Sequence, residues 1–151
     1  MRESKYHQGK FHPKHPEKYK GNPSNIVYRS SWELKFMRYC DLNEKIMEWG
    51  SEEFFIPYFD PTTNKVRRYF PDFIVKIKEN SGNIKKYVVE VKPKKQTIEP
   101  KQTKGKQKKT FINEVMMYTK NVAKWKAARE WCEDHMVEFK IITEDELNPY
   151  K

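Results

Sequence analysis

Apolar residues recur at helical spacing near the start of the chain. The stretch begins at Ser30 or Ser31, either of which can cap a helix, and it ends near Asn43. Trp32, Phe36 and Tyr39 fall on one stripe, and such a stripe is typical of a helix packed on a core. Glu33 lies on a flank of this helix that is half apolar, so we expect its carboxylate at the rim of the core.

A second helical pattern runs from Phe111 to Met136, where Asn121 can divide it into two helices. Between the two helical patterns and after the second, runs rich in β-branched and aromatic residues predict strands. The expected strands are Glu53–Phe59, Lys65–Ile77, Ile84–Lys92 and Val137–Thr143, with a short apolar segment, Ile46–Trp49, before the first of them. Asn80-Ser81-Gly82 predicts a tight hairpin turn between the second and third strands. The predicted order is therefore helix, three-stranded meander, helix, strand.

Two segments of the chain lack this periodicity. Residues 1–27 are rich in Lys, His, Pro and Gly, and we expect them to form a basic N-terminal arm. Residues 93–109 begin with Pro93, which cannot donate to a strand ladder, and predict a basic loop. The remaining chain, residues 28–151, is long enough for one domain with its own core.

The charge of the chain indicates what kind of partner it binds. The 151 residues include 31 Lys and Arg against 21 Asp and Glu, a net charge of +10. Within residues 92–109, eight lysines stand against Glu99 alone, and such blocks favour a polyanion because bound phosphates release counterions. A merely solvated, highly charged surface is the alternative. We expect DNA, most simply double-stranded, to contact Arg29, Ser30, Lys94, Lys95, Lys104, Lys106, Lys108, Lys109 and Lys124.

Other classes of protein are disfavoured by composition. No apolar run approaches the length of a membrane span, and the N-terminus has no apolar segment that would predict a secretory signal. Cys40 and Cys132 are too few for a disulfide framework or a zinc site, so a reducing compartment is expected. Nothing in the sequence points to a small-molecule substrate.

The candidate chemistry lies on two neighbouring predicted strands. Pro71-Asp72 precedes one apolar run, and Glu90-Val91-Lys92 ends the next. Glu90 interrupts an apolar strand, where burying a carboxylate without a partner would cost roughly several kcal/mol. A divalent cation would compensate it. If the two strands pair antiparallel, Asp72 and Glu90 converge on one face beside Lys92.

This trio suits the hydrolysis of a phosphodiester. Asp72, Glu90 and the carbonyl of Val91 would hold Mg²⁺, for which Mn²⁺ can substitute, by hard oxygen ligands. Lys92 would orient the attacking water and stabilise negative charge in the transition state, and Glu33 would complete the metal shell from the first helix. The alternative treats these residues as unrelated surface charges and one internal ion pair.

The pattern resembles the PD-(D/E)xK nuclease superfamily, whose restriction-endonuclease-like core is α-β-β-β-α-β with a mixed central sheet flanked by helices. More narrowly, Tyr28–Glu33, Arg67–Phe73 and Val89–Pro93 resemble the transposon end-cleaving endonucleases of the TnsA type. They also resemble the head completion proteins of T-even-type tailed phages, a likeness that covers nearly the whole chain. The TnsA-type enzymes can carry Gln where Glu90 stands, so the resemblance implies an intact active site of Glu33, Asp72, Glu90 and Lys92.

The phage resemblance implies a virion protein found in the head or neck and in the host cytoplasm, with an endonuclease activity on DNA at the portal or neck after packaging. A second hypothesis is a structural virion protein that binds DNA and portal or neck subunits on a nuclease scaffold without catalysis. A third keeps the fold and assigns resolution of branched DNA junctions.

Overall fold

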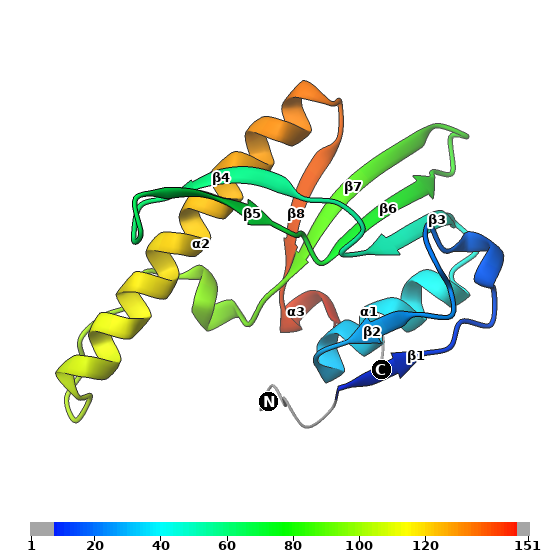
Figure 1. Ribbon diagram of the computed structural model, residues 1–151. Coiled ribbons are helices and arrows are strands. Elements are labelled where there is room, and N and C mark those ends of the chain that lie inside the picture. Colours follow the sequence, from blue (N-terminus) through cyan, green and yellow to red (C-terminus); the bar gives the residue numbers. More distant parts are fainter. Residues whose placement is uncertain (1–7, 148–151) are drawn as a thin grey trace.

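A four-stranded sheet with the strand order β3-β6-β7-β8 lies at the centre of the computed structural model, which describes residues 8–147 (Figure 1). Strands β3, β6 and β7 form an antiparallel meander, and β8 pairs parallel with β7. The sheet is therefore mixed, as the resemblance to the PD-(D/E)xK superfamily implies. The strands span Ile46–Ser51 (β3), Phe73–Lys78 (β6), Ile84–Val91 (β7) and Glu138–Ile142 (β8).

Helix α1 (Ser31–Leu42) packs on one face of this sheet. Ser30 caps the helix, since its hydroxyl oxygen accepts from the backbone N–H of Glu33 at 3.1 Å. The rings of Phe36 and Phe73 lie 4.7 Å apart in the core between helix and sheet. The cap and the aromatic stripe predicted from the sequence are both confirmed.

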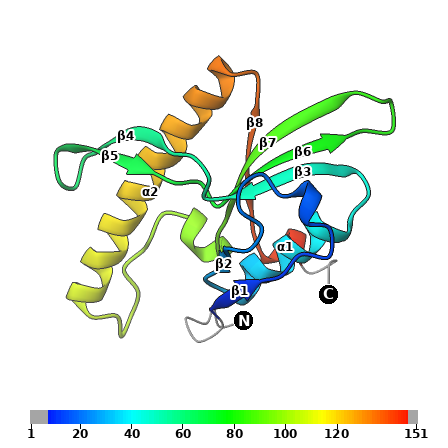
Figure 2. The same ribbon diagram turned by 45° about the vertical axis from the view of Figure 1, so that its right-hand side comes forward.

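The opposite face of the sheet is covered by helix α2 (Lys108–Asp134) and by a separate hairpin of strands β4 (Ile56–Asp60) and β5 (Lys65–Tyr69) (Figures 1 and 2). Helix α2 is continuous, so the predicted division at Asn121 is wrong. Asn121 lies 3% exposed within the helix, and its weak local preference for other conformations is overridden by packing. The helix ends near Met136, which has φ +57°.

The predicted strand over residues 65–77 is two strands in two different sheets. The chain leaves the hairpin at Phe70-Pro71-Asp72 and enters the central sheet at Phe73. Pro71 cannot donate to a ladder, which explains why pairing stops at this point. The short apolar segment at Ile46–Trp49 belongs to β3, the edge strand of the central sheet. In the sequence, the hairpin β4–β5 is inserted between β3 and β6. The expected meander is present, with β3 in place of residues 53–59.

The N-terminal segment does not form the separate arm that we expected, as far as the structure describes it. Strands β1 (Gly9–Phe11) and β2 (Ile26–Tyr28) pair antiparallel, with the short helix η1 (Pro16–Lys18) between them. Phe11 and Tyr19 are buried, with ring centroids 5.8 and 4.8 Å from that of Trp49. The segment packs on the core through scattered aromatic residues, which show no local periodicity and so were not recognised in the sequence. Residues 1–7 of the expected arm lie outside the described range.

The remaining elements connect β7 to α2 and close the fold. Helix η2 (Lys94–Thr97) follows β7 and opens the basic loop, which leads to α2. Helix α3 (Glu144–Leu147) places buried Leu147 in the same core as α1. Between residues 8 and 147, no helix combines the length and the apolar character needed to cross a membrane.

Candidate active site

Asp72, the residue just before β6, lies opposite Glu90 of β7. Phe73 of β6 pairs with Val89 of β7, so the same antiparallel register continued by one pair places Asp72 across from Glu90. The backbone N–H of Val91 donates to Asp72 Oδ2 at 2.8 Å, which holds the end of β6 against β7. Directly opposed residues of an antiparallel pair point to the same face of the sheet. The convergence expected from the hairpin is therefore present.

Glu90 is a buried carboxylate, only 5% exposed, and it has two named partners. The hydroxyl of Tyr69 donates to Glu90 Oε1 at 2.6 Å, and the ammonium nitrogen of Lys92 lies 3.6 Å from Glu90 Oε2. Burial raises the pKa of Glu90, whereas Lys92 and the Tyr69 hydrogen bond oppose that rise. The sequence predicted that the cost of burying this acid would be offset, and these contacts are part of the compensation.

Asp72 is half-buried, and its ionised form is strongly disfavoured. Burial raises the pKa of Asp72 well above its usual range, and the negative charges of Glu90 and then Glu33 raise it further. The Val91 N–H and the Lys92 ammonium act in the opposite direction without cancelling the effect. Glu90 and Glu33 thus repel the ionised form of Asp72 at one edge of the sheet, and an added cation would relieve this repulsion.

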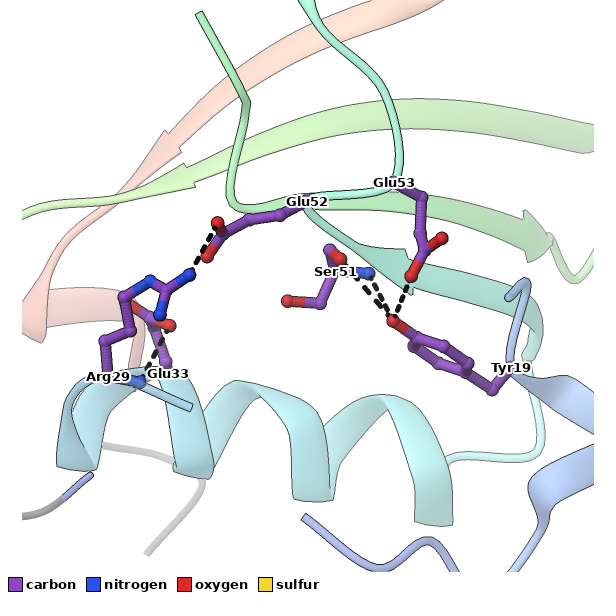
Figure 3. Close-up of polar contacts among 6 residues, drawn as sticks. All are labelled: Tyr19, Arg29, Glu33, Ser51, Glu52 and Glu53. Atoms are coloured by element: carbon purple, nitrogen blue, oxygen red, sulfur yellow. Dashed lines mark hydrogen bonds and ion pairs between the residues drawn. The ribbon is translucent and has the colours of Figure 1, made fainter. Parts of the chain in front are cut away.

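A hydrogen-bonded path links Glu33 to Asp72 through Arg29 and Glu52, and Figure 3 shows the part of it from Glu33 to Glu52. The backbone N–H of Arg29 donates to Glu33 Oε1 at 3.2 Å, and Arg29 Nη2 lies 3.1 Å from Glu52 Oε1. The backbone N–H of Glu52 in turn donates to the carbonyl of Asp72 at 3.1 Å. Glu52 has φ +53°, a conformation that L residues seldom adopt, at the corner after β3. The sequence analysis missed Glu52, because no local pattern marks this corner.

Glu53 turns away from this path. Its carboxylate accepts from the hydroxyl of Tyr19 at 2.6 Å, and Tyr19 also accepts from the Ser51 N–H at 3.2 Å (Figure 3). The same carboxylate lies against Gly21, which has φ +132°, and a Cβ at Gly21 would come within 2.7 Å of its oxygens. Glu53 therefore fastens the N-terminal segment to the corner after β3, while Glu52 reaches toward the candidate site.

Lys124 lies closer to the acids than its place on the polar side of α2 predicts. Its ammonium nitrogen is 5.7 Å from the ring centroid of Tyr69, whose hydroxyl holds Glu90, and 5.9 Å from that of Tyr58. Burial lowers the pKa of Lys124, and the neighbouring charge of Lys92 lowers it further. Tyr69 and Lys124 extend the candidate site beyond the four predicted residues. Only the fold reveals Tyr69, because it sits on a hairpin outside the central sheet.

The other residues expected to contact DNA differ in their surroundings. Ser30 is 2% exposed and its hydroxyl caps α1, and its contact with DNA stays a prediction. Arg29 is paired with Glu52, Lys94 lies 3.1 Å from Asp145, and Lys106 lies 2.7 Å from Glu114. Exposed lysines of the loop and of the start of α2 remain predicted contacts: Lys95, Lys104, Lys108 and Lys109.

The donor atoms at the site suit a hard divalent cation. Asp72 and Glu90 offer carboxylate oxygens on one face, and such oxygens are the preferred ligands of Mg²⁺. Within residues 8–147, no three His, Cys, Asp or Glu side chains are arranged to hold a metal ion by themselves. A cation here would therefore draw on two carboxylates, a backbone carbonyl and water. The mutual repulsion at Asp72 is the structural feature that a cation fits.

Comparison with known proteins bears on this geometry directly. A family model described as TnsA-like endonuclease N terminal matches residues 43–144, which contain all four strands of the central sheet. The chain belongs to the TnsA-like endonuclease family. The matched region of this TnsA-like chain includes Asp72, Glu90 and Lys92, whereas Glu33 lies outside it. The mixed sheet with flanking helices agrees with the restriction-endonuclease-like fold expected from the sequence.

A second comparison covers nearly the whole TnsA-like chain. The head completion nuclease of Enterobacteria phage T4 is 42% identical over 144 residues, which are 93% of this chain and 93% of the T4 protein. The resemblance to T-even-type head completion proteins is thereby confirmed. The likeness extends over both the sheet that carries the acids and the helices that cover it.

Proposed function

We propose that this protein is a metal-dependent DNA endonuclease that hydrolyses phosphodiester bonds. The observation that supports the proposal most strongly is the position of Asp72 opposite Glu90, where β6 begins and β7 ends, with the Lys92 ammonium 3.6 Å from Glu90. Two neighbouring acids beside a lysine, one of which raises the pKa of the other, are typical of a site that handles a cation and a phosphate together. Family membership and the name of the T4 relative support the same reaction class.

Asp72, Glu90 and the carbonyl of Val91 would hold Mg²⁺ or Mn²⁺, with Glu33 on the side of α1. When bound, such a cation lowers the pKa of a coordinated water and neutralises charge on the phosphate. Tyr69 fixes the rotamer of Glu90 through its 2.6 Å hydrogen bond. Glu33 is fixed by the Arg29 N–H, so each acid is oriented by a neighbour before substrate binds.

Lys92 is the group that faces the reaction. Its ammonium donates to the attacking water and to a non-bridging phosphate oxygen, where negative charge grows in the transition state. The water oxygen forms a bond to phosphorus as the bond from phosphorus to the leaving oxygen breaks. The proton of the water passes to solvent, and the leaving oxygen takes a proton from water. Lys124 adds a second positive charge on the α2 side of the same acids.

The setting follows from the relative. We propose that the protein belongs to the virion head or neck and acts on DNA at the portal or neck after packaging; the name of the T4 relative, head completion nuclease, supports a role in completing the head. Assembly takes place in the host cytoplasm. The loop of residues 93–107 and the start of α2 extend beyond the sheet (Figures 1 and 2), a feature that also favours a DNA-binding role beside catalysis.

A plasmid assay tests the proposal. With Mg²⁺ or Mn²⁺, the wild-type protein is expected to nick supercoiled DNA, and Glu90→Ala is expected to lower the rate at least about a hundredfold because it removes a cation ligand. Glu130→Ala is the control, since Glu130 is an exposed acid on α2. Equal nicking by wild type and Glu90→Ala would contradict the site, and full activity in excess chelator would contradict the metal dependence.

A further inference from the structure

A groove of about 770 Å³ separates the loop of residues 93–107 from the first half of α2. Both ribbon views place this loop alongside that half of the helix, beyond the edge of the sheet (Figures 1 and 2). The volume lies within the range of ligand-binding pockets, about 300–1,000 Å³. We call it the α2 groove and define it by Lys95, Ile98, Lys101, Met117, Tyr118 and Asn121, which line it.

The wall of the α2 groove is fastened to the helix. The ammonium of Lys106 donates to the carbonyl of Lys101 at 2.8 Å and to Glu114 Oε1 on α2 at 2.7 Å. The side-chain amide of Gln102 donates to the carbonyl of Lys106 at 3.3 Å. Gly105 has φ +88°, which allows the sharp turn at the tip of the loop. The groove is therefore built by defined contacts and exists before any ligand binds.

The α2 groove begins next to the candidate active site. Lys95 follows Lys92 by three positions, at the start of η2. Asn121 precedes Lys124 by three positions on α2, and residues three apart on a helix are neighbours on its surface. An extended ligand in the groove would thus pass from the acids of the sheet along α2 toward the N-terminus of that helix.

The lining combines two kinds of chemistry. Three lysines and two glutamates line the groove, and Lys106 is paired with Glu114, which leaves the exposed Lys95 and Lys101 against Glu99. Ile98 and Met117 are apolar side chains that remain 55% and 58% exposed. Tyr118 adds an aromatic ring. At the floor, Asn121 is 3% exposed, and its amide nitrogen has no hydrogen-bond partner among the described residues. A ligand that suits this groove must carry negative charge, flat apolar faces and hydrogen-bond acceptors together.

An unpaired nucleic acid strand has all three properties, and a duplex does not. In a duplex the bases are stacked inside, so its phosphates could meet the lysines while Ile98, Met117 and Tyr118 stayed exposed to water. An unpaired strand offers base faces for such side chains and phosphates for the lysines. We propose that the α2 groove binds an unpaired DNA strand next to the cleavage site, an inference that rests on the proposed nuclease function for its biological meaning.

Two adjacent methionines provide a matched test. Met116 and Met117 are exposed to similar extents, 46% and 58%, but only Met117 lines the α2 groove. Binding of a fluorescent oligothymidylate is measured by anisotropy with the full chain in chelator, so that no cleavage occurs. Met117→Glu is expected to raise the Kd at least about tenfold through lost stacking and added repulsion, whereas Met116→Glu changes it by less than about threefold. Ile98→Ala, which adds no charge, is expected to weaken binding in the same direction.

The same assay with a blunt duplex of equal length separates the alternatives. Met117→Glu and Met116→Glu are expected to weaken duplex binding equally, because each adds one negative charge to a basic surface. Equal effects of the two variants on single-strand binding would overturn the groove assignment, and so would equal affinity of the wild type for both DNAs. If the groove takes a protein segment instead, Met117→Glu would leave oligonucleotide binding unchanged, which would also overturn the assignment. This binding assay measures no cleavage, so it tests the groove separately from the nuclease activity. If the wild type fails to nick plasmid but Met117→Glu still weakens oligonucleotide binding, only the nuclease proposal is contradicted.

Discussion

Lys92→Met is expected to lower the rate of DNA cleavage at least about a hundredfold and to leave the fold and DNA affinity nearly unchanged. Methionine keeps the length of the side chain and removes its charge. The Lys92 side chain is 26% exposed and its ammonium nitrogen lies 3.6 Å from Glu90 Oε2, so in the proposed reaction it contacts both the acids and the phosphate. Its contribution is greatest in the transition state, where charge on the phosphate oxygens increases.

Lys95→Met is the matched control for this prediction. Lys95 lies on the same basic segment and lines the α2 groove, whereas Lys92 is the lysine paired with Glu90. Its loss should act on the affinity for DNA and change the single-turnover rate at saturating DNA by less than about threefold, because one phosphate contact alters binding more than chemistry. Rates measured under single-turnover conditions separate the two effects. Equal losses of the single-turnover rate in both variants would remove Lys92 from the reaction.

Asp72→Asn is expected to raise the melting temperature in chelator at neutral pH. The folded-state pKa of Asp72 lies well above its value in the unfolded chain, chiefly through burial and then through Glu90. When a carboxyl has a raised pKa in the folded state, the folded protein loses stability relative to the unfolded chain as the pH rises through that pKa. The ionised Asp72 therefore destabilises the fold at neutral pH. Asparagine removes the charge and keeps an oxygen for the Val91 N–H. Each kcal/mol gained corresponds to about 2–4 °C in a domain of this size.

The sign of this effect fixes its pH dependence. Below the pKa of the unfolded aspartate, about 3.9, the carboxyl is protonated in both states, so the advantage of Asp72→Asn should disappear. Added Mg²⁺ should raise the melting temperature of the wild type more than that of the variant, which binds the cation more weakly. Calorimetry in chelator and in Mg²⁺ at two pH values measures all four cases, with Glu130→Gln as the exposed control. A variant less stable than wild type at neutral pH without cation would contradict this electrostatic account.

The core of the site was predictable because local rules determine it. The two-residue period of a strand places Val88 and Glu90 on one face, and the turn around Gly82 sets the antiparallel pairing of the flanking strands. Together they bring Asp72 to Glu90 without any knowledge of the rest of the fold. Ser30 as the cap of α1 is predictable for the same reason, since capping involves residues only three positions apart.

Long-range packing decides the features that the sequence did not reveal. Tyr69 reaches Glu90 from a hairpin whose separation from the central sheet is visible only once Pro71 is seen to end one ladder. Glu52 takes part through a corner with positive φ, which no residue preference predicts for a glutamate. Tyr19, with few apolar neighbours in sequence, is buried because Trp49 packs against its ring. In each case the deciding contact joins residues more than fifteen positions apart.

Titration of Mn²⁺ into the wild type, Asp72→Asn and Glu90→Gln, followed by isothermal calorimetry without DNA, tests the shared cation site most directly. The opposed carboxylates should give the wild type saturable binding, and each variant should weaken it at least about tenfold because a charged ligand is lost. Glu130→Gln should bind as the wild type does. Undiminished Mn²⁺ binding in both site variants would mean that Asp72 and Glu90 do not hold a common ion.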